Sequence, residues 1–140
     1  MKNIKTGLFV GKFMAYHRGH QACITQFSSL CSKELKLVLC YNSNQRVAFE
    51  HRKKWLTEDF TSGMLKNQKI NLLFMNEDGI PDYPIGLQKW CNKVRTEIGT
   101  FDLIFGNDDY IIPTAKEFGV PYLMPDTNRD KLNLQNVFPN

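Results

Sequence analysis

The sequence lacks the features that mark several classes of protein. It has no apolar run near the roughly 18 residues that a membrane span requires. The apolar stretch after its basic N-terminus is short and is broken by Lys12, Arg18 and two histidines, which is not typical of a secretory signal. The net charge of +4 suits small anionic ligands but is too weak to indicate nucleic acid. We therefore expect a cytoplasmic protein that binds neither nucleic acid nor a membrane.

Cysteine pairs with metal-binding or redox spacing are also missing. The four cysteines, at positions 23, 31, 40 and 91, form no C-x-x-C pair. Each lies in an apolar pattern, which favours reduced core residues over a disulfide or zinc framework. The sequence also contains no repeat, linker or low-complexity tract, so we expect residues 1–140 to form one domain.

Short apolar runs alternate with amphipathic stretches along the whole chain. The pattern predicts strands over residues 5–10, 35–41, 70–75, 101–105 and 120–124, followed by a short polar tail. It predicts helices over residues 20–31, from near Glu50 to Met64, from Pro84 to Gly99, and over 110–118. This alternation is typical of an α/β fold with a mainly parallel sheet and helices on both faces. Ligands then bind beyond the carboxyl ends of the strands.

The loop after the first predicted strand reads GKFMAYHRGH over residues 11–20, which is neither a P-loop nor a dinucleotide fingerprint. His17 and His20 are three residues apart at the start of a predicted helix, where they share a face and where anions are favoured. Imidazoles there can donate to phosphate oxygens, Gly11 permits close approach, and Lys12 adds a positive charge. The alternative is that His17 caps the helix and His20 lies on its surface. The pairing after a strand-end glycine favours phosphate binding.

This loop resembles the G-K-F-x-x-x-H-x-G-H signature of the H-x-G-H nucleotidyltransferase superfamily, with Ala15 where the family usually has proline. Residues 77–90, EDGIPDYPIGLQKW, closely resemble a stretch of the nicotinamide mononucleotide (NMN) adenylyltransferase domain of NadR-type proteins. Arg52 and Trp55 resemble that subgroup's R-x-x-W pair, and DTNR over residues 126–129 resembles its D-x-D-R segment. The resemblance covers roughly residues 6–129 and includes no counterpart of the kinase domain of the bifunctional proteins.

The resemblance implies a Rossmann-like, nucleotidyltransferase-type fold with a five-stranded parallel sheet in the order 3-2-1-4-5. It implies transfer of an adenylyl group from ATP to NMN, which gives NAD and pyrophosphate. We expect Mg²⁺ to be held mainly by the ATP phosphates. A homo-oligomer is plausible from the family.

The resemblance also implies roles for individual residues. His17, His20 and Lys12 would contact the ATP phosphates and stabilise the transition state. Trp90 or Tyr83 would stack on the nicotinamide ring, although Trp90 also lies on the apolar stripe of its predicted helix, which equally indicates core packing. Leu87 stands where the family often has a second tryptophan. The full set of expected substrate contacts is Gly11, Phe13, Met14, Arg46, Asp78, Gly79, Ile80, Tyr83, Leu87, Trp90, Gly106, Asn107, Asp108, Arg129 and Asn133.

Some of these residues have a structural alternative. The backbones of Asp78, Gly79 and Ile80 would bond the carboxamide, and Gly106 and Asn107 would cradle the adenosine. Asn107 and Asp108 also suit a helix N-cap. Arg46 could reach a phosphate, but a solvated loop arginine is at least as consistent with its position.

One family motif has no counterpart. The family carries a C-terminal [ST]-x-T-x-x-R phosphate-binding motif, whereas residues 133–140 read NLQNVFPN and contain no serine, threonine or arginine. Three readings remain open. Arg129, Lys131 and Lys12, or a neighbouring subunit, could supply the missing charge. The chain could instead be a non-catalytic module that binds NAD or a related nucleotide, or a nucleotidyltransferase for another phosphorylated substrate.

Overall fold

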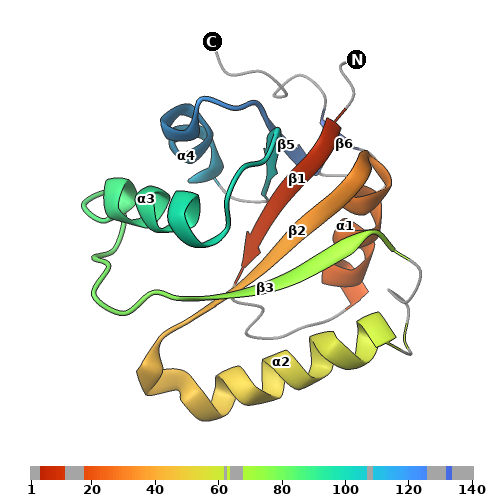
Figure 1. The fold of residues 1–140 in the computed structure, drawn as a ribbon, viewed down its shortest axis with the longest axis horizontal. Helices are drawn as coiled ribbons and strands as arrows, with labels where there is room; N and C mark the ends of the chain where they lie inside the picture. The colour runs from red at the N-terminus through yellow and green to blue at the C-terminus, as the bar shows by residue number, and fades with distance from the viewer. Residues whose placement is uncertain are drawn as a thin grey trace.

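We describe a computed structural model of the chain over residues 4–11, 18–61, 63, 68–106, 109–125 and 132–133. Strands and helices alternate along it (Figure 1). The strands are β1 (Ile4–Gly11), β2 (Cys31–Tyr41), β3 (Ile70–Asn76), β4 (Leu103–Phe105), β5 (Tyr122–Pro125) and β6 (Leu132–Asn133). The helices are α1 (Arg18–Ser29), the short 3-10 helix η1 (Ser43–Gln45), α2 (Arg46–Thr61), α3 (Leu87–Glu97) and α4 (Ile111–Phe118).

The sheet order is β3-β2-β1-β4-β5-β6. The first five strands of this order pair in parallel, which confirms the predicted α/β class and the order 3-2-1-4-5. The chain adds strands outward from β1 to β3, and then returns across the sheet to place β4 on the other side of β1. The topological switch point therefore lies between β1 and β4.

Both faces of the sheet are covered, as predicted. On one face, Ile24 and Phe27 of α1 and Leu56 of α2 pack with alternate sheet residues such as Leu35 and Leu37. On the other face, the second core contains Leu8, Val38, Met75 and Ile104 of the sheet, with Val94 and Ile98 of α3 and Ile111 and Ala115 of α4. Figure 1 shows α3 and α4 together on one side of the strands and α1 on the other side. The period-two alternation of the strands sends neighbouring side chains into the two cores.

Several element boundaries differ from the sequence prediction. β6 lies in the segment expected to be only a polar tail, and it pairs antiparallel with β5 through Met124 and Asn133. α2 begins at Arg46 rather than near Glu50, and α3 begins at Leu87, so Pro84 lies in the turn before the helix. The prediction for α2 was based on Leu56, Phe60 and Met64, and it therefore missed the earlier turn that contains Val47, Ala48 and Phe49. α4 ends at Gly119, as expected.

The cysteines agree with the prediction of reduced core residues. Cys31, Cys40 and Cys91 are buried, Cys23 is half-buried, and all four are free thiols. Burial raises the pKa of the Cys31 and Cys91 thiols to about 11. Within the described ranges, no helix has both the length and the apolar character needed to cross a bilayer.

Candidate functional site

A cavity of about 460 Å³ lies at the carboxyl ends of the strands, on the face covered by α3 and α4. Val10 and Gly11 end β1, Ile104 and Phe105 end β4, and Gly106 follows β4, so the cavity spans the switch point. Its volume falls within the range of about 300–1,000 Å³ that is usual for small-molecule sites. Parallel sheets bind ligands at this position because two neighbouring chain segments there turn away from each other.

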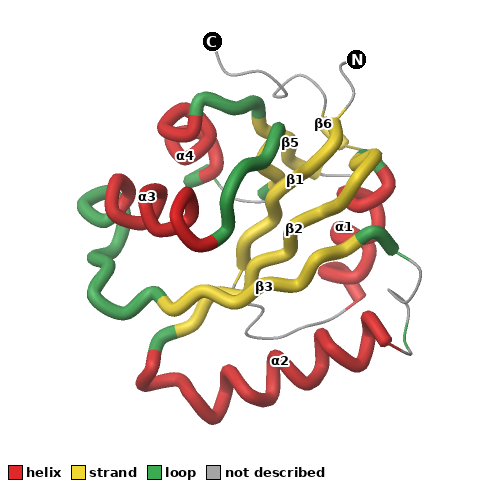
Figure 2. Tube along the Cα trace, viewed as in Figure 1, coloured by secondary structure: helices red, strands yellow, loops and turns green. Residues whose placement is uncertain are grey.

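The loop between β3 and α3 forms one wall of the cavity, and Figure 2 shows it leaving the end of β3 and returning to α3. Hydrogen bonds brace this wall. The Glu77 amide donates to the Tyr41 carbonyl at the end of β2, at 2.7 Å. The Lys89 ammonium donates to the Gly79 carbonyl at 2.9 Å, and the Lys93 ammonium donates to the Asn76 carbonyl. The loop is therefore tied both to the neighbouring strand and to the helix that follows it.

Asp78 turns toward η1 rather than into the cavity. Its Oδ1 accepts the Ser43 amide at 2.9 Å, and its Oδ2 accepts the Ser43 hydroxyl. The hydrogen bonds from Ser43 hold the pKa of the Asp78 carboxyl below its ordinary value, with smaller contributions from Asn76 and Lys93. The carboxylate therefore fixes the connection after β2 against the β3–α3 loop.

Trp90 packs against the core and also lines the cavity, so its position is compatible with both interpretations of its sequence pattern. Its indole packs against the second core, with the Phe118 ring centroid at 6.3 Å, and it also lines the cavity. Its Nε1 donates to Oε2 of Glu77 at 2.8 Å. Glu77 itself lines the cavity, so a carboxylate is fixed at the edge of an aromatic ring within the same wall.

The β4–α4 connection forms the opposite wall, where Gly106, Tyr110, Ile111 and Thr114 line the cavity. The Thr114 hydroxyl donates to the Tyr110 carbonyl at 2.6 Å, within the first turn of α4. The Tyr110 ring faces the Tyr83 ring of the other wall, with 4.6 Å between their centroids. The two walls thus meet through a pair of partly exposed aromatic side chains.

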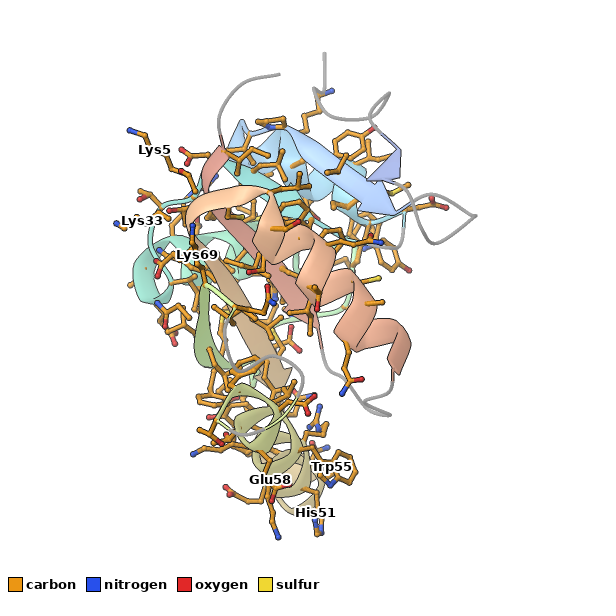
Figure 3. All side chains as sticks on the ribbon, turned by 90° about the vertical axis from the view of Figure 1, so that its right-hand side faces the viewer. Lys5, Lys33, His51, Trp55, Glu58 and Lys69 are labelled. Carbon is orange, nitrogen blue, oxygen red and sulfur yellow. The ribbon has the colours of Figure 1, made fainter. Side chains whose placement is uncertain are left out.

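The charged side chains in the described cavity lining are all acidic. Glu77 and Asp82 line the cavity, and its described lining contains no lysine, arginine or histidine. Lys5, Lys33 and Lys69 lie near the amino ends of β1, β2 and β3, at the opposite end of the sheet (Figure 3). His51, Trp55 and Glu58 lie along α2, away from those lysines (Figure 3). The described lining therefore suits a neutral or cationic group better than a phosphate.

The structure brings together six of the residues expected from the sequence: the cavity lining contains Gly11, Ile80, Tyr83, Leu87, Trp90 and Gly106. Asp78 and Gly79 lie in the same loop but outside the lining. For three residues only the backbone is described: His20 lies in the first turn of α1, Arg46 begins α2, and Asn133 ends β6. The rest lie outside the described residues: Lys12, Phe13, Met14, His17, Asn107, Asp108 and Arg129.

The sequence reasoning missed other lining residues, above all Glu77, Asn42 and Tyr110. Asn42 follows directly after a predicted strand and Glu77 lies two residues after another, at the edge where ligands bind, and this position could have identified them. Tyr110 ends the loop that was expected to cradle the adenosine, but it was not itself selected as a site residue. Within the described ranges, no group of three or more His, Cys, Asp or Glu side chains could hold a metal ion.

Several known proteins are similar to this chain in sequence. A nicotinamide-nucleotide adenylyltransferase from Methanocorpusculum labreanum is 24% identical over 130 residues, which covers 87% of this chain and 70% of that protein. The trifunctional NAD biosynthesis/regulator protein NadR is 26% identical in Salmonella typhimurium and 27% identical in Escherichia coli. These matches cover 97% and 94% of this chain but only 36% and 35% of the relatives. No family model matches the chain.

Solved structures give the same fold. A crystal structure of NadR in complex with NR superposes with a TM-score of 0.65 at 22% identity, covering 90% of this chain and 39% of that one. NadR in complex with NAD and AMP-PNP superposes with a TM-score of 0.63 at 24% identity, covering 90% and 38%. The chain is therefore similar in sequence to a nicotinamide-nucleotide adenylyltransferase and to NadR, and it has the fold of the solved NadR chains. The 77–90 stretch that carried the resemblance forms the braced wall of the cavity.

Proposed function

We propose that the chain is a nicotinamide-nucleotide adenylyltransferase, which transfers AMP from ATP to NMN and releases pyrophosphate. The single observation that carries the proposal is the position of the 77–90 stretch: Glu77, Ile80, Tyr83 and Trp90 line a cavity at the switch point. The names of the relatives support a nucleotidyltransferase-like function in NAD biosynthesis. The solved NadR complexes contain NR, NAD and AMP-PNP, which are ligands of the same chemical kind.

The proposed reaction needs no protein nucleophile. A phosphate oxygen of NMN forms a bond to the α-phosphorus of ATP, and the bond from that phosphorus to the bridging oxygen of the β-phosphate breaks. The electron pair leaves with pyrophosphate. Such a transfer depends on holding the two phosphates in line and on stabilising the charge that develops on them. The substrate would be ATP carrying Mg²⁺ on its phosphates, because Mg²⁺ is commonly bound with few protein ligands.

The two walls of the cavity would bind different parts of the substrates. The nicotinamide end of NMN would lie against the β3–α3 wall, where Trp90 offers an aromatic face to a cationic pyridinium ring. The adenosine would lie toward the β4–α4 wall, near Gly106. The phosphates would lie toward the start of α1, because the described cavity lining carries no positive charge and helix N-termini favour anions. Lys12, His17 and His20 are our candidates for contacting them.

The experiment is NAD formation by the purified chain from NMN, ATP and Mg²⁺, with His20→Ala as the matched control. We expect the wild type to form NAD and the variant to lose about 10²–10³ in kcat, because one donor to a developing charge is removed. Thermal unfolding of the variant should stay close to that of the wild type. An unchanged kcat would contradict the role of His20, and a wild type without NAD formation would contradict the proposed activity.

A second candidate is a module that binds NAD or a related nucleotide without turnover. The observation that favours it is the sequence of residues 133–140, which has none of the Ser, Thr or Arg residues of the family's C-terminal phosphate-binding motif. The two candidates differ in one result. The module would bind NMN or NAD in calorimetry yet release no pyrophosphate when ATP is added, whereas the enzyme would do both.

A further inference from the structure

The cavity wall at the proposed nicotinamide position carries the carboxylate of Glu77. Glu77 lines the cavity and was not among the residues that the sequence analysis selected. Its backbone amide is held by Tyr41 at 2.7 Å and its Oε2 by the Trp90 indole at 2.8 Å. Both ends of the residue are therefore anchored, and the carboxylate has a defined position at the edge of the aromatic ring.

The charge of Glu77 is not balanced within the described lining. The other ionisable acid there is Asp82, and no lysine, arginine or histidine accompanies them. The nearest cations on α3 are directed to the loop backbone: Lys89 donates to Gly79 and Lys93 to Asn76, and Lys93 also pairs with Glu97 at 3.5 Å. Neither lysine lines the cavity. A ligand group beside Trp90 therefore meets a net negative wall.

Two mononucleotides of similar size differ in how they would meet this wall. The nicotinamide ring is a cation with an uncharged carboxamide, whose N–H groups can donate to a carboxylate. The nicotinate ring carries a carboxylate, which offers only acceptors and brings a second negative charge close to Glu77. Juxtaposed like charges are unfavourable at an interface, so the wall discriminates against nicotinate.

Resting on the proposed function, we propose that Glu77, fixed by Trp90, is a specificity-determining residue. Its negative charge selects a mononucleotide with a cationic ring and an uncharged ring substituent, and rejects one whose ring carries a carboxylate. Trp90 acts here as a positioning residue, because its indole N–H holds the carboxylate in place.

The test measures binding of NMN and of nicotinate mononucleotide separately, by calorimetry and without ATP. The wild type should prefer NMN by about tenfold or more. Glu77→Gln keeps an acceptor for the Trp90 N–H but removes the charge, so this preference should fall by about tenfold. Asp82→Asn is the matched control, because it removes the other acidic charge of the lining. It should change the ratio of the two affinities by less than about threefold.

Circular dichroism and tryptophan fluorescence would confirm that each variant is folded, and Glu77→Ala provides a second neutral variant if Glu77→Gln is not. The inference is overturned if the neutral variants keep the wild-type ratio, or if Asp82→Asn shifts it as strongly. In either case NMN still binds and the proposed function stands. Failure of the wild type to bind either mononucleotide would overturn the proposed function, and this inference with it.

Discussion

The two walls of the cavity are held in different ways. The β3–α3 wall is braced by hydrogen bonds to three neighbouring elements: Tyr41 of β2, Ser43 of η1, and Trp90 and the lysines of α3. The β4–α4 wall is held mainly by apolar packing, because Ile111 and Ala115 are buried in the second core beneath it. The first wall fixes charged and carbonyl groups in defined positions, whereas the described lining of the second wall carries no charged side chain.

This difference bears on recognition. Hydrogen-bonded carboxylates and carbonyls can distinguish one ring substituent from another, since a wrong substituent leaves a polar group unpaired or repelled. An apolar wall favours any planar group of suitable size and discriminates less. We therefore expect changes in the β3–α3 wall to alter which ligand binds, and changes in the β4–α4 wall to alter mainly how tightly ligands bind.

The largest effect should follow from Gly86→Ala in the β3–α3 wall. A Cβ at position 86 would overlap the Pro81 carbonyl oxygen and lie 2.7 Å from the Pro81 carbonyl carbon, so the loop backbone must move. We expect a loss of about 3 kcal/mol in the free energy of unfolding, measured by urea denaturation. The control is Gly79→Ala in the same loop, where φ is 78° and the nearest atom is Lys89 Nζ at 4.0 Å. It should cost only about 1–2 kcal/mol, from the left-handed backbone. Equal losses would contradict the close packing at position 86.

The same substitution in the other wall should cost less. In Gly106→Ala, the new Cβ would lie 2.6 Å from Cδ1 of Ile111, which is the end of a flexible side chain, and 3.3 Å from its Cβ. We expect about 1 kcal/mol of destabilisation in the same denaturation experiment, because Ile111 can change its rotamer. A loss as large as that of Gly86→Ala would show that the packed wall is as rigid as the braced one.

Trp90→Phe removes one hydrogen bond of the braced wall and keeps an aromatic ring. The Glu77 carboxylate loses the donor at 2.8 Å, so we expect about 1–2 kcal/mol of destabilisation. The matched control is Tyr83→Phe in the same wall, which keeps the ring that lies against Tyr110 and should stay within about 0.5 kcal/mol of the wild type. A Trp90→Phe variant as stable as the wild type would contradict the bracing role of this hydrogen bond.

The smallest effect concerns Asp78. Its pKa is lowered in the folded state, so its contribution to stability is present above the ordinary carboxyl pKa and is lost as the pH falls through the folded value. Ser43→Ala removes the hydroxyl donor, which is part of the main cause of the shift, so the pKa should move up toward its ordinary value. Titration of the side-chain carboxyl by ¹³C NMR measures this directly. An unchanged pKa in the variant would contradict the role of the hydroxyl and leave the shift to the remaining donors, first of all the backbone amide of residue 43.

The sequence predicted the framework well because strands and amphipathic helices carry periodic apolar patterns. All five parallel strands and their order agree with expectation, although the order came from the resemblance. β6 was missed because a pair of residues is too short to show a period. The start of α2 was missed because the prediction was based on apolar residues further along, from Leu56, and not on Val47, Ala48 and Phe49 in the first turn.

The site was predicted less completely. Residues 77–90 were selected as a unit, and most of the chosen side chains in that stretch do line the cavity. Asp78 was included for its backbone, but its side chain turns to Ser43, a contact 35 residues away that no local pattern encodes. The role of Glu77 depends on its distance from Trp90, 13 residues further on, and only the folded loop brings them together.

The most direct test of the central claim is the position of the nicotinamide ring in the bound state. Intermolecular NOEs between the ring protons of NMN and an isotope-labelled chain would locate it. We predict contacts with the Trp90 indole and the Tyr83 ring on the β3–α3 wall. Contacts confined to Tyr110 and Ile111 on the β4–α4 wall, in a chain that binds NMN, would contradict the account.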